Sequence, residues 1–101
     1  MIAILYRWRI NPEKEQQFIE SWSNVTEFLR TNRGSLGSRL HRGNDRLFYG
    51  YAQWKSDADR QKAFQDSTEI TDSIEKMRDA IEESFPEIRL KPIADFLLST
   101  E

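Results

Sequence analysis

The sequence predicts an α+β fold with the ferredoxin-like order β-α-β-β-α-β, in which a four-stranded antiparallel sheet carries its helices on one face. Segments rich in β-branched and aromatic residues, typical of strands, alternate with segments whose apolar residues recur every three or four positions, typical of helices. A chain of 101 residues is long enough to bury one hydrophobic core but not two. We therefore expect a single domain over residues 1–101.

The first strand and the first helix follow directly from their residues. Ile2–Ile10 is rich in β-branched and aromatic residues and predicts a strand. Asn11 is a typical helix-capping residue and Pro12 suits the first helical position, so a helix should begin here and run to about Thr31. Its apolar residues recur at gaps of four, three and four and form one stripe: Phe18, Trp22, Val25 and Leu29.

The middle of the chain predicts a β-hairpin, with strands at residues 35–43 and 46–54. The strands are joined at Gly43-Asn44-Asp45, residues that favour tight turns. Each strand alternates between the two faces of the sheet, so the third strand separates Trp54 from Tyr51. The hairpin therefore decides which side chains can meet in a site.

The length of the hairpin loop determines which residues share a face, because a shift of one residue turns every side chain to the other face. With an even loop, which Asn44 and Asp45 suggest, Arg39 and His41 lie on the face of Trp54. With an odd loop, the same face carries two other residues: Ser38 and Leu40. We expect the even loop, so that Arg39 and His41 join a set of small and aromatic residues: Phe48, Gly50, Ala52 and Trp54.

Two helices and a strand are predicted in the remainder of the chain. Ser56 caps a short helix through Phe64. A longer helix should follow and end before Pro86, because apolar residues recur at gaps of four, three, four and four: Ile70, Ile74, Met77, Ile81 and Phe85. Residues 87–98 predict a last strand, in which Pro92 has no N–H to donate and must lie at an edge or a bulge.

Composition excludes several classes of function. The 15 Lys and Arg residues nearly balance the 17 Asp and Glu residues, so neither nucleic acid nor an anionic membrane is expected as a partner. The chain has no Cys, and it shows neither a glycine-rich phosphate loop nor a metal-binding spacing, so we expect no metal and no cofactor. The apolar start is interrupted by Arg7 and Arg9 and resembles neither a signal peptide nor a membrane span, which favours a cytoplasmic protein.

The strands are apolar on both faces, which predicts a second packing surface. Tyr49 and Tyr51 alternate with the residues that face the helices, so they lie on the face that the helices leave bare. An exposed apolar patch of this kind is typical of an interface. We expect a homodimer in which two sheets pack face to face, the alternative being a monomer with an apolar face.

Small residues at the centre of the third strand predict a pocket. Gly50 and Ala52 leave volume unfilled, and the first strand, which pairs with the third in this fold, places Tyr6 and Trp8 beside them. A small centre with an aromatic and cationic rim is typical of a pocket for a small apolar or aromatic ligand. Residues expected to line it are Trp8, Trp22, Phe48, Gly50 and Ala52, with Trp54 either as its wall or as an ordinary core residue.

The same residues resemble a known family. The element order, the turn "NRGSLGS" and the stretch "FYGYAQWKSDAD", in which Trp54-Lys55-Ser56 ends the third strand and caps the next helix, are similar to the antibiotic biosynthesis monooxygenase domain of the dimeric α+β-barrel superfamily. The resemblance covers residues 1 to about 64. It implies a homodimer with one pocket per subunit between sheet and helices. Some members oxidise polycyclic phenols to quinones with O2 and no cofactor, related members degrade haem, and others have no known activity.

The resemblance also separates this chain from the haem-degrading members. Their pocket tryptophan corresponds to Trp54, but their asparagine falls at about Tyr6. Their histidine ligand falls near Phe64, and no histidine follows His41. The glutamate that many members place two residues before the tryptophan is Ala52 here. Axial ligation of haem by a histidine of this helix is therefore excluded.

Three functions remain open. The first is a cofactor-independent monooxygenase that acts with O2 on an electron-rich aromatic or polyketide-like molecule. Arg39 would then stabilise the substrate anion, His41 is the one conventional base near neutral pH, and Trp54 and Tyr6 would orient the substrate oxygen. The second is a non-catalytic dimer that binds a small molecule or has a structural role. The third is an isomerase-type enzyme acting on a small aromatic acid or lactone.

Overall fold

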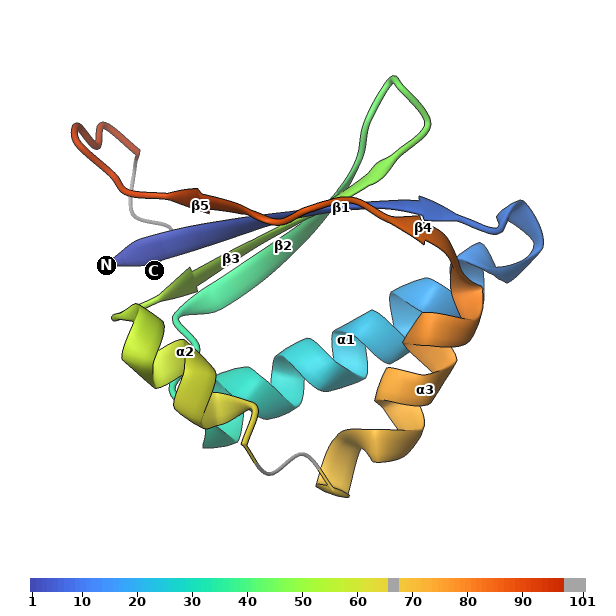
Figure 1. Cartoon of the computed structure of the whole chain (residues 1–101), viewed down its shortest axis with the longest axis horizontal. Helices are drawn as coiled ribbons and strands as arrows, with labels where there is room; N and C mark the ends of the chain where they lie inside the picture. The colour runs from blue at the N-terminus through green and yellow to red at the C-terminus, as the bar shows by residue number, and fades with distance from the viewer. Residues whose placement is uncertain (66–67, 98–101) are drawn as a thin grey trace.

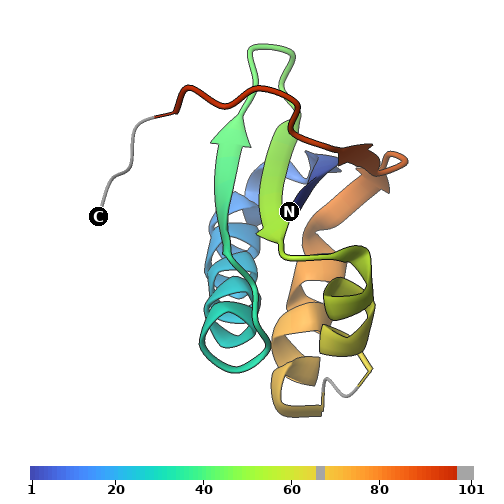
Figure 2. The same cartoon turned by 90° about the vertical axis from the view of Figure 1, so that its left-hand side faces the viewer.

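The computed structural model describes residues 1–65 and 68–97 and confirms the predicted α+β, ferredoxin-like class (Figure 1). The strands are β1 (Ile2–Ile10), β2 (Gly37–Arg42), β3 (Phe48–Trp54), β4 (Ile81–Ser84) and β5 (Ile88–Leu90). The helices are α1 (Glu15–Asn32), α2 (Asp57–Ala63) and α3 (Thr71–Ala80), with single 3-10 turns at Pro12–Lys14 and Thr68–Ile70. The antiparallel sheet runs in the order β2-β3-β1-β4, and α1, α2 and α3 lie on the same side of it (Figures 1 and 2).

The predicted pairing of the first and third strands is confirmed, and it sets the geometry of the site. In the antiparallel ladder between β1 and β3, Tyr6 lies opposite Gly50 and Trp8 lies opposite Phe48. Because directly opposed residues point to the same face, the aromatic residues of β1 stand beside the small residues of β3.

The predicted hairpin register is wrong by one residue. Two hydrogen bonds close the hairpin, from the Gly43 N–H to the Leu47 carbonyl at 2.8 Å and from the Arg46 N–H to the Gly43 carbonyl at 3.2 Å. Arg46 has a positive φ of 69°, so residues 44–46 form the common three-residue loop that ends in a left-handed residue. The odd loop results because Arg46 adopts this conformation, although glycine or asparagine would be the usual residue there.

The odd loop moves two predicted site residues to the other face of the sheet. His41 lies opposite Tyr49 and Arg39 opposite Tyr51, so both point away from the helices. Their places on the helix-facing side are taken by Ser38 opposite Ala52 and by Leu40 opposite Gly50, which is the alternative that an odd loop predicts.

The predicted helix through Phe85 is also shorter than expected. The helix α3 ends at Ala80, and Ile81 already has an extended backbone (φ −87°, ψ 122°). Residues Ile81–Ser84 form β4, which pairs with the end of β1, and the Phe85 N–H donates to the Arg7 carbonyl at 3.0 Å. Apolar residues at gaps of four fit a helix, but hydrogen bonding to the edge of β1 satisfies this backbone as a strand instead.

The fourth strand of the predicted sheet consists of two short pieces. The strand β4 pairs with Trp8–Ile10 and β5 pairs with Ala3–Leu5, so both occupy the same edge of β1. The predicted last strand at residues 87–98 is therefore limited to Ile88–Leu90. Pro92 follows β5 in a segment without regular structure, and Leu98 lies outside the described residues.

The hydrophobic core lies between the sheet and the helices, in two clusters. One surrounds Ile4 and Trp54, and the other surrounds Phe18 and Phe48. Trp54, Phe18 and Ile4 are the largest of the almost fully buried side chains. The predicted caps support the helices that cover this core, since the Asn11 and Ser56 side chains accept hydrogen bonds from backbone N–H groups at 3.0 and 3.1 Å.

Candidate functional site

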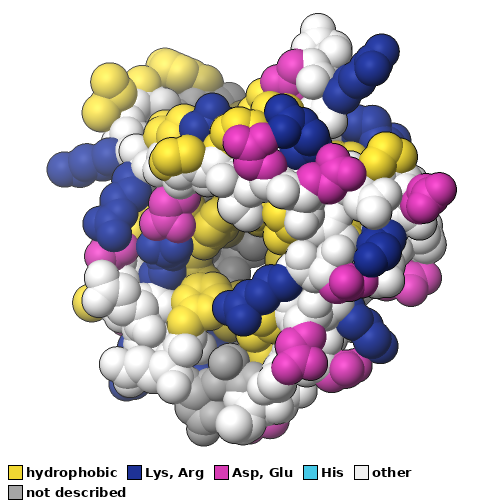
Figure 3. All heavy atoms as spheres, turned by 45° about the vertical axis from the view of Figure 1, so that its right-hand side comes forward, with side chains coloured by type: hydrophobic (Ala, Val, Ile, Leu, Met, Phe, Trp, Pro, Cys, Tyr) yellow, Lys and Arg dark blue, Asp and Glu magenta, His cyan; other side chains and the backbone are white. Residues whose placement is uncertain are grey.

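A cavity of about 400 Å³ lies between the sheet and the helices. Figure 3 shows a hollow lined by hydrophobic side chains, with Lys or Arg side chains at its rim. Large aromatic and apolar side chains from the sheet and from all three helical regions form most of its wall: Tyr6, Trp8, Trp22, Trp54, Phe64 and Met77. A concave apolar space with a few polar groups is the usual form of a small-molecule site.

Gly50, at the centre of β3, has no side chain and so leaves room for the aromatic residues that line the cavity. A Cβ atom at Gly50 would lie 2.8 Å from the Trp8 ring, which is closer than atoms can approach. Gly50 and Ala52 line the cavity, and the Trp8 indole lies in the space directly above Gly50. Trp8 in turn stacks on Tyr6, with ring centroids 5.5 Å apart and planes within 4°. Gly50 thus allows the aromatic wall to form.

Tyr6 brings the main polar group of the sheet into this apolar wall. The Arg60 guanidinium of α2 donates a hydrogen bond of 2.9 Å to the Tyr6 hydroxyl oxygen. The same guanidinium donates to a Glu87 carboxylate at 2.7 Å, and the Arg60 side chain is only 13% exposed. Burial raises the pKa of Tyr6 above its ordinary value, although the hydrogen bond and the charge of Arg60 oppose the rise. Tyr6 is therefore protonated at neutral pH.

The Tyr6 hydroxyl retains a donor that can serve a ligand. Its oxygen accepts from Arg60, and within residues 1–65 and 68–97 no acceptor receives its O–H. A hydroxyl can donate one hydrogen bond while it accepts another. Because Tyr6 lines the cavity, its proton is available to an oxygen atom of a bound molecule.

No pattern in the sequence singles out Arg60. It lies in a short helix of mixed charge, and its contact with Tyr6 joins residues 54 positions apart. A capping serine at Ser56 locates the helix, but which of its charged residues turns toward β1 depends on how the helix packs. This residue could be found only in the folded structure.

Trp54 and Trp22 both contribute to the wall from opposite sides. Trp54 is 2% exposed and its ring lies 6.1 Å from that of Phe64, so it is at once a core residue and a cavity wall. Trp22 projects from α1, and its indole nitrogen lies 3.7 Å from the position that a Cβ at Gly50 would occupy. Ala52 also lines the cavity. The structure therefore brings Tyr6, Trp8, Trp22, Gly50, Ala52 and Trp54 together, as predicted.

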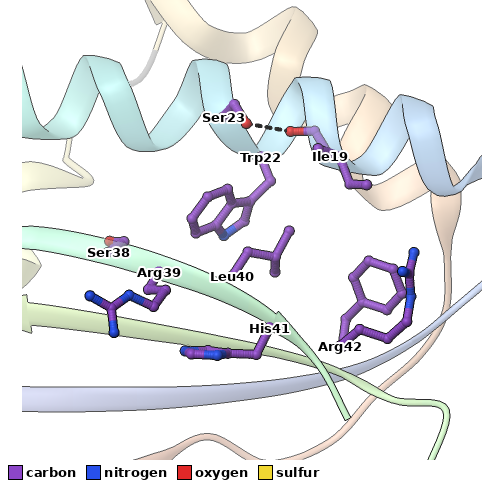
Figure 4. A pocket seen from close by; sticks show the side chains of 9 residues that line it. Ile19, Trp22, Ser23, Ser38, Arg39, Leu40, His41 and Arg42 are labelled. Carbon is purple, nitrogen blue, oxygen red and sulfur yellow. Dashed lines mark hydrogen bonds between the residues drawn. The ribbon is translucent and has the colours of Figure 1, made fainter. Parts of the chain in front are cut away.

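The other predicted site residues border a different hollow, at the outer edge of β2 (Figure 4). Leu40 and Trp22 lie on one side of β2, whereas Arg39 and His41 extend on the opposite side (Figure 4). Phe48 belongs to the wall of this outer hollow and to the core around Phe18, not to the wall of the aromatic cavity. The even-loop condition that placed Arg39 and His41 beside Trp54 is not met.

Tyr49 and Tyr51 lie on the sheet face that points away from the helices, as predicted. The Tyr49 hydroxyl donates to the Asp45 carboxylate in the hairpin loop, and this bond lowers the pKa of Asp45. The Tyr51 hydroxyl accepts from the Gln53 amide at 3.1 Å.

The described residues contain neither a metal-binding cluster nor a membrane-spanning helix. In residues 1–65 and 68–97, no cluster of three or more His, Asp or Glu side chains could hold a metal ion. Over the same residues, no helix is both long and apolar enough to cross a membrane.

The amino-acid sequence places the chain in a known protein family. Residues 1–76 match the family model described as antibiotic biosynthesis monooxygenase, and the chain belongs to this family. Its fold is that of the dimeric α+β barrels. No curated protein sequence matches the chain.

Solved structures share the fold at low sequence identity. SnoaB, described as a cofactor-independent oxygenase from Streptomyces nogalater, superposes with a TM-score of 0.77 at 12% identity over 94% of this chain and 95% of its own. Rv0793 from Mycobacterium tuberculosis gives a TM-score of 0.76 at 11% identity over 95% and 98% of the two chains. A conserved protein from Methanosarcina mazei Go1 gives 0.74 at 13% identity over 89% and 90%.

Proposed function

We propose that this protein is a cofactor-independent monooxygenase that uses O2 to oxidise an electron-rich aromatic or polyketide-like phenol in the aromatic cavity. The observation that carries the proposal is the Tyr6 hydroxyl, held by the poorly exposed cation Arg60 within a mostly apolar wall. Membership of the antibiotic biosynthesis monooxygenase family supports it, as does the fold shared with a protein described as a cofactor-independent oxygenase.

The cavity suits a substrate that supplies its own electrons. A deprotonated phenol transfers electrons to O2, and a ring CH2 group then becomes a carbonyl while the second oxygen atom leaves as water. The Tyr6 O–H donates to the phenolate oxygen, and the nearby charge of Arg60 favours the anion. The aromatic walls exclude water, which strengthens both effects. The four electrons taken up by O2 all come from the substrate, so the reaction needs no other reductant.

Deprotonation of the substrate is assigned to no side chain of the cavity. Among the described residues that line it there is no His, Asp, Glu or Lys, so the lining offers no conventional general base. Arg39 and His41 point to the other face of the sheet and have no part in this step. The reactive form is the phenolate that exists in solution or forms as the phenol binds.

Oxygen consumption tests this proposal directly. With dithranol as the substrate, removal of the Tyr6 donor in Tyr6→Phe should lower kcat by about a hundredfold, as the loss of one donor to a developing oxyanion does elsewhere. Arg60→Gln should act in the same direction. The matched control is Tyr49→Phe, which removes a hydroxyl that is bound to Asp45 in the hairpin loop, outside the cavity lining.

Two results would contradict the proposal. One is an equal rate of O2 uptake in Tyr6→Phe and in the unchanged protein. The other is a rise in thermal stability with several phenols but no O2 uptake with any of them, which would favour a binding protein of the same fold.

The assembly that we propose is a homodimer in which the sheet face without helices packs on a second copy. The support is a group of apolar side chains beyond β5 that have little cover, since Ile93 is 95% exposed and Phe96 is 94% exposed. They adjoin a hollow on this sheet face that Ala3 and Tyr51 line. Exposed apolar surface of this kind is typical of an interface.

A further inference from the structure

One position on the cavity-facing side of α3 carries a charge. Ile74, Met77 and Ile81 follow each other at helical spacing and line the aromatic cavity. Arg78, four residues after Ile74, shares this side and also lines the cavity, while its side chain is exposed. A residue that both lines a cavity and meets solvent lies at the opening, so Arg78 places a guanidinium at the mouth of the apolar site.

Among the described residues, Arg78 is the arginine that lines the aromatic cavity, and its guanidinium is not engaged by another part of the protein. Arg9, Arg42 and Arg60 each pair with a glutamate. Within residues 1–65 and 68–97, no carboxylate, carbonyl or aromatic ring interacts with the Arg78 side chain. Its neighbour Asp79 is already held by Lys14 at 2.9 Å and by Gln17 at 3.0 Å.

The position of Arg78 at the end of α3 does not account for the direction in which it points. A cation in the last turn of a helix interacts favourably with the helix dipole. That interaction is similar on every side of the last turn, including the sides that face only solvent. A cation beside an apolar cavity loses hydration on one side, which an anionic ligand would compensate.

We propose that Arg78 is a carboxylate-binding residue and that the ligand of the cavity is a phenolic aromatic acid. The inference rests on the proposed function only in taking the aromatic cavity as the ligand site. Tyr6 on β1 meets the phenol oxygen, and Arg78 on α3 meets a carboxylate at the opening. A guanidinium binds a carboxylate through two parallel hydrogen bonds, which fixes orientation as well as charge.

This arrangement selects one orientation of the bound ligand. The ring system fills the aromatic space, the phenol points toward the sheet, and the acid stays near solvent, where its hydration is partly kept. Arg78 thus acts on substrate choice and orientation, whereas Tyr6 and Arg60 act on the reacting oxygen. Loss of Arg78 should therefore remove the preference for an acid without removing the capacity to bind a ring.

Binding of a matched pair of probes tests the inference without any turnover. Isothermal titration calorimetry would compare 6-hydroxy-2-naphthoate with 6-hydroxy-2-naphthamide, which has nearly the same shape but no charge. We expect the unchanged protein to bind the acid about tenfold more tightly than the amide, which corresponds to about 1.4 kcal/mol. In Arg78→Gln the two affinities should become equal. Arg78→Lys should keep part of the preference, because lysine keeps the positive charge but cannot donate two parallel hydrogen bonds to one carboxylate.

The control variant is Arg46→Gln, which removes the same charge from the exposed hairpin loop far from the cavity lining. It should keep the full preference for the acid. A preference that survives in Arg78→Gln, or that is absent from the unchanged protein, would overturn the inference and leave the proposed oxygenase function intact. A preference that depends on Arg78, in a protein that consumes no O2, would support the inference and contradict the oxygenase.

Discussion

The two faces of β3 differ although their residues alternate along a single strand. Phe48, Gly50, Ala52 and Trp54 are buried against the helices, whereas Tyr49, Tyr51 and Gln53 are half-buried on the other face. The first face forms the wall of the aromatic cavity and part of the core. The second face shares its side of the sheet with Arg39 and His41. The residues with the most evident chemistry in the sequence therefore lie on the side away from the cavity.

The largest effect should come from removing the core residue of the first face. Trp54→Ala should lower the free energy of unfolding by about 3–5 kcal/mol, because it removes a large side chain that is 2% exposed and leaves a cavity. Guanidinium unfolding measures this change. The control, Gln53→Ala, alters the adjacent residue on the second face and should cost less than about 1 kcal/mol. Similar costs for the two variants would show that the faces do not differ in packing.

A change on the second face should affect assembly instead of folding. In the proposed dimer, Tyr51→Glu places a charge in the interface, and we expect the dissociation constant to rise by about a hundredfold, or about 2.7 kcal/mol. Analytical ultracentrifugation over a range of protein concentrations measures it. The control, Lys62→Glu, introduces the same residue on α2, on the helical side of the molecule. If the dissociation constant of the dimer were unchanged in Tyr51→Glu, this sheet face would be excluded as the interface.

The smallest effect is expected from the chain's one histidine. His41 points away from the cavity, so His41→Gln should leave the rate of O2 uptake within about twofold of the unchanged rate. The rate should rise with pH and level off once the phenol is ionised, and the pH profile of His41→Gln should match that of the unchanged protein. Tyr6 adds no step near neutral pH, because burial raises its pKa. A strong loss of O2 uptake in His41→Gln would identify His41 as the base.

Local sequence signals predicted most of the elements correctly. The strand Ile2–Ile10 is observed with the predicted bounds, and Ser56 caps α2 as expected. The apolar stripe of α1 faces the core, with Phe18, Val25 and Leu29 buried. These features were predictable because alternation, helical periodicity and capping depend on residues close together in the chain.

The errors had two sources, a contact between distant segments and the conformation of one turn residue. Residues from Ile81 onward have a helical pattern, but the free edge of β1 supplies hydrogen bonds that make Ile81–Ser84 a strand. The hairpin contains Asn44 and Asp45, which suit a two-residue turn, yet Arg46 takes the left-handed conformation and lengthens the loop to an odd number. This one-residue difference in register places Arg39 and His41 on the face away from the helices.

The sequence by itself determined the class of fold, the family and the aromatic side chains of the cavity. Tyr6, Trp8 and Trp54 could be assigned to one face because strand alternation is a local property. Only the tertiary structure decided which charges reach that cavity. The contact between Arg60 and Tyr6 spans 54 positions, and Arg78 reaches the cavity because it shares a side of α3 with Ile74, which packs there. Long, flexible charged side chains are placed by the packing of their helices, which no local pattern records.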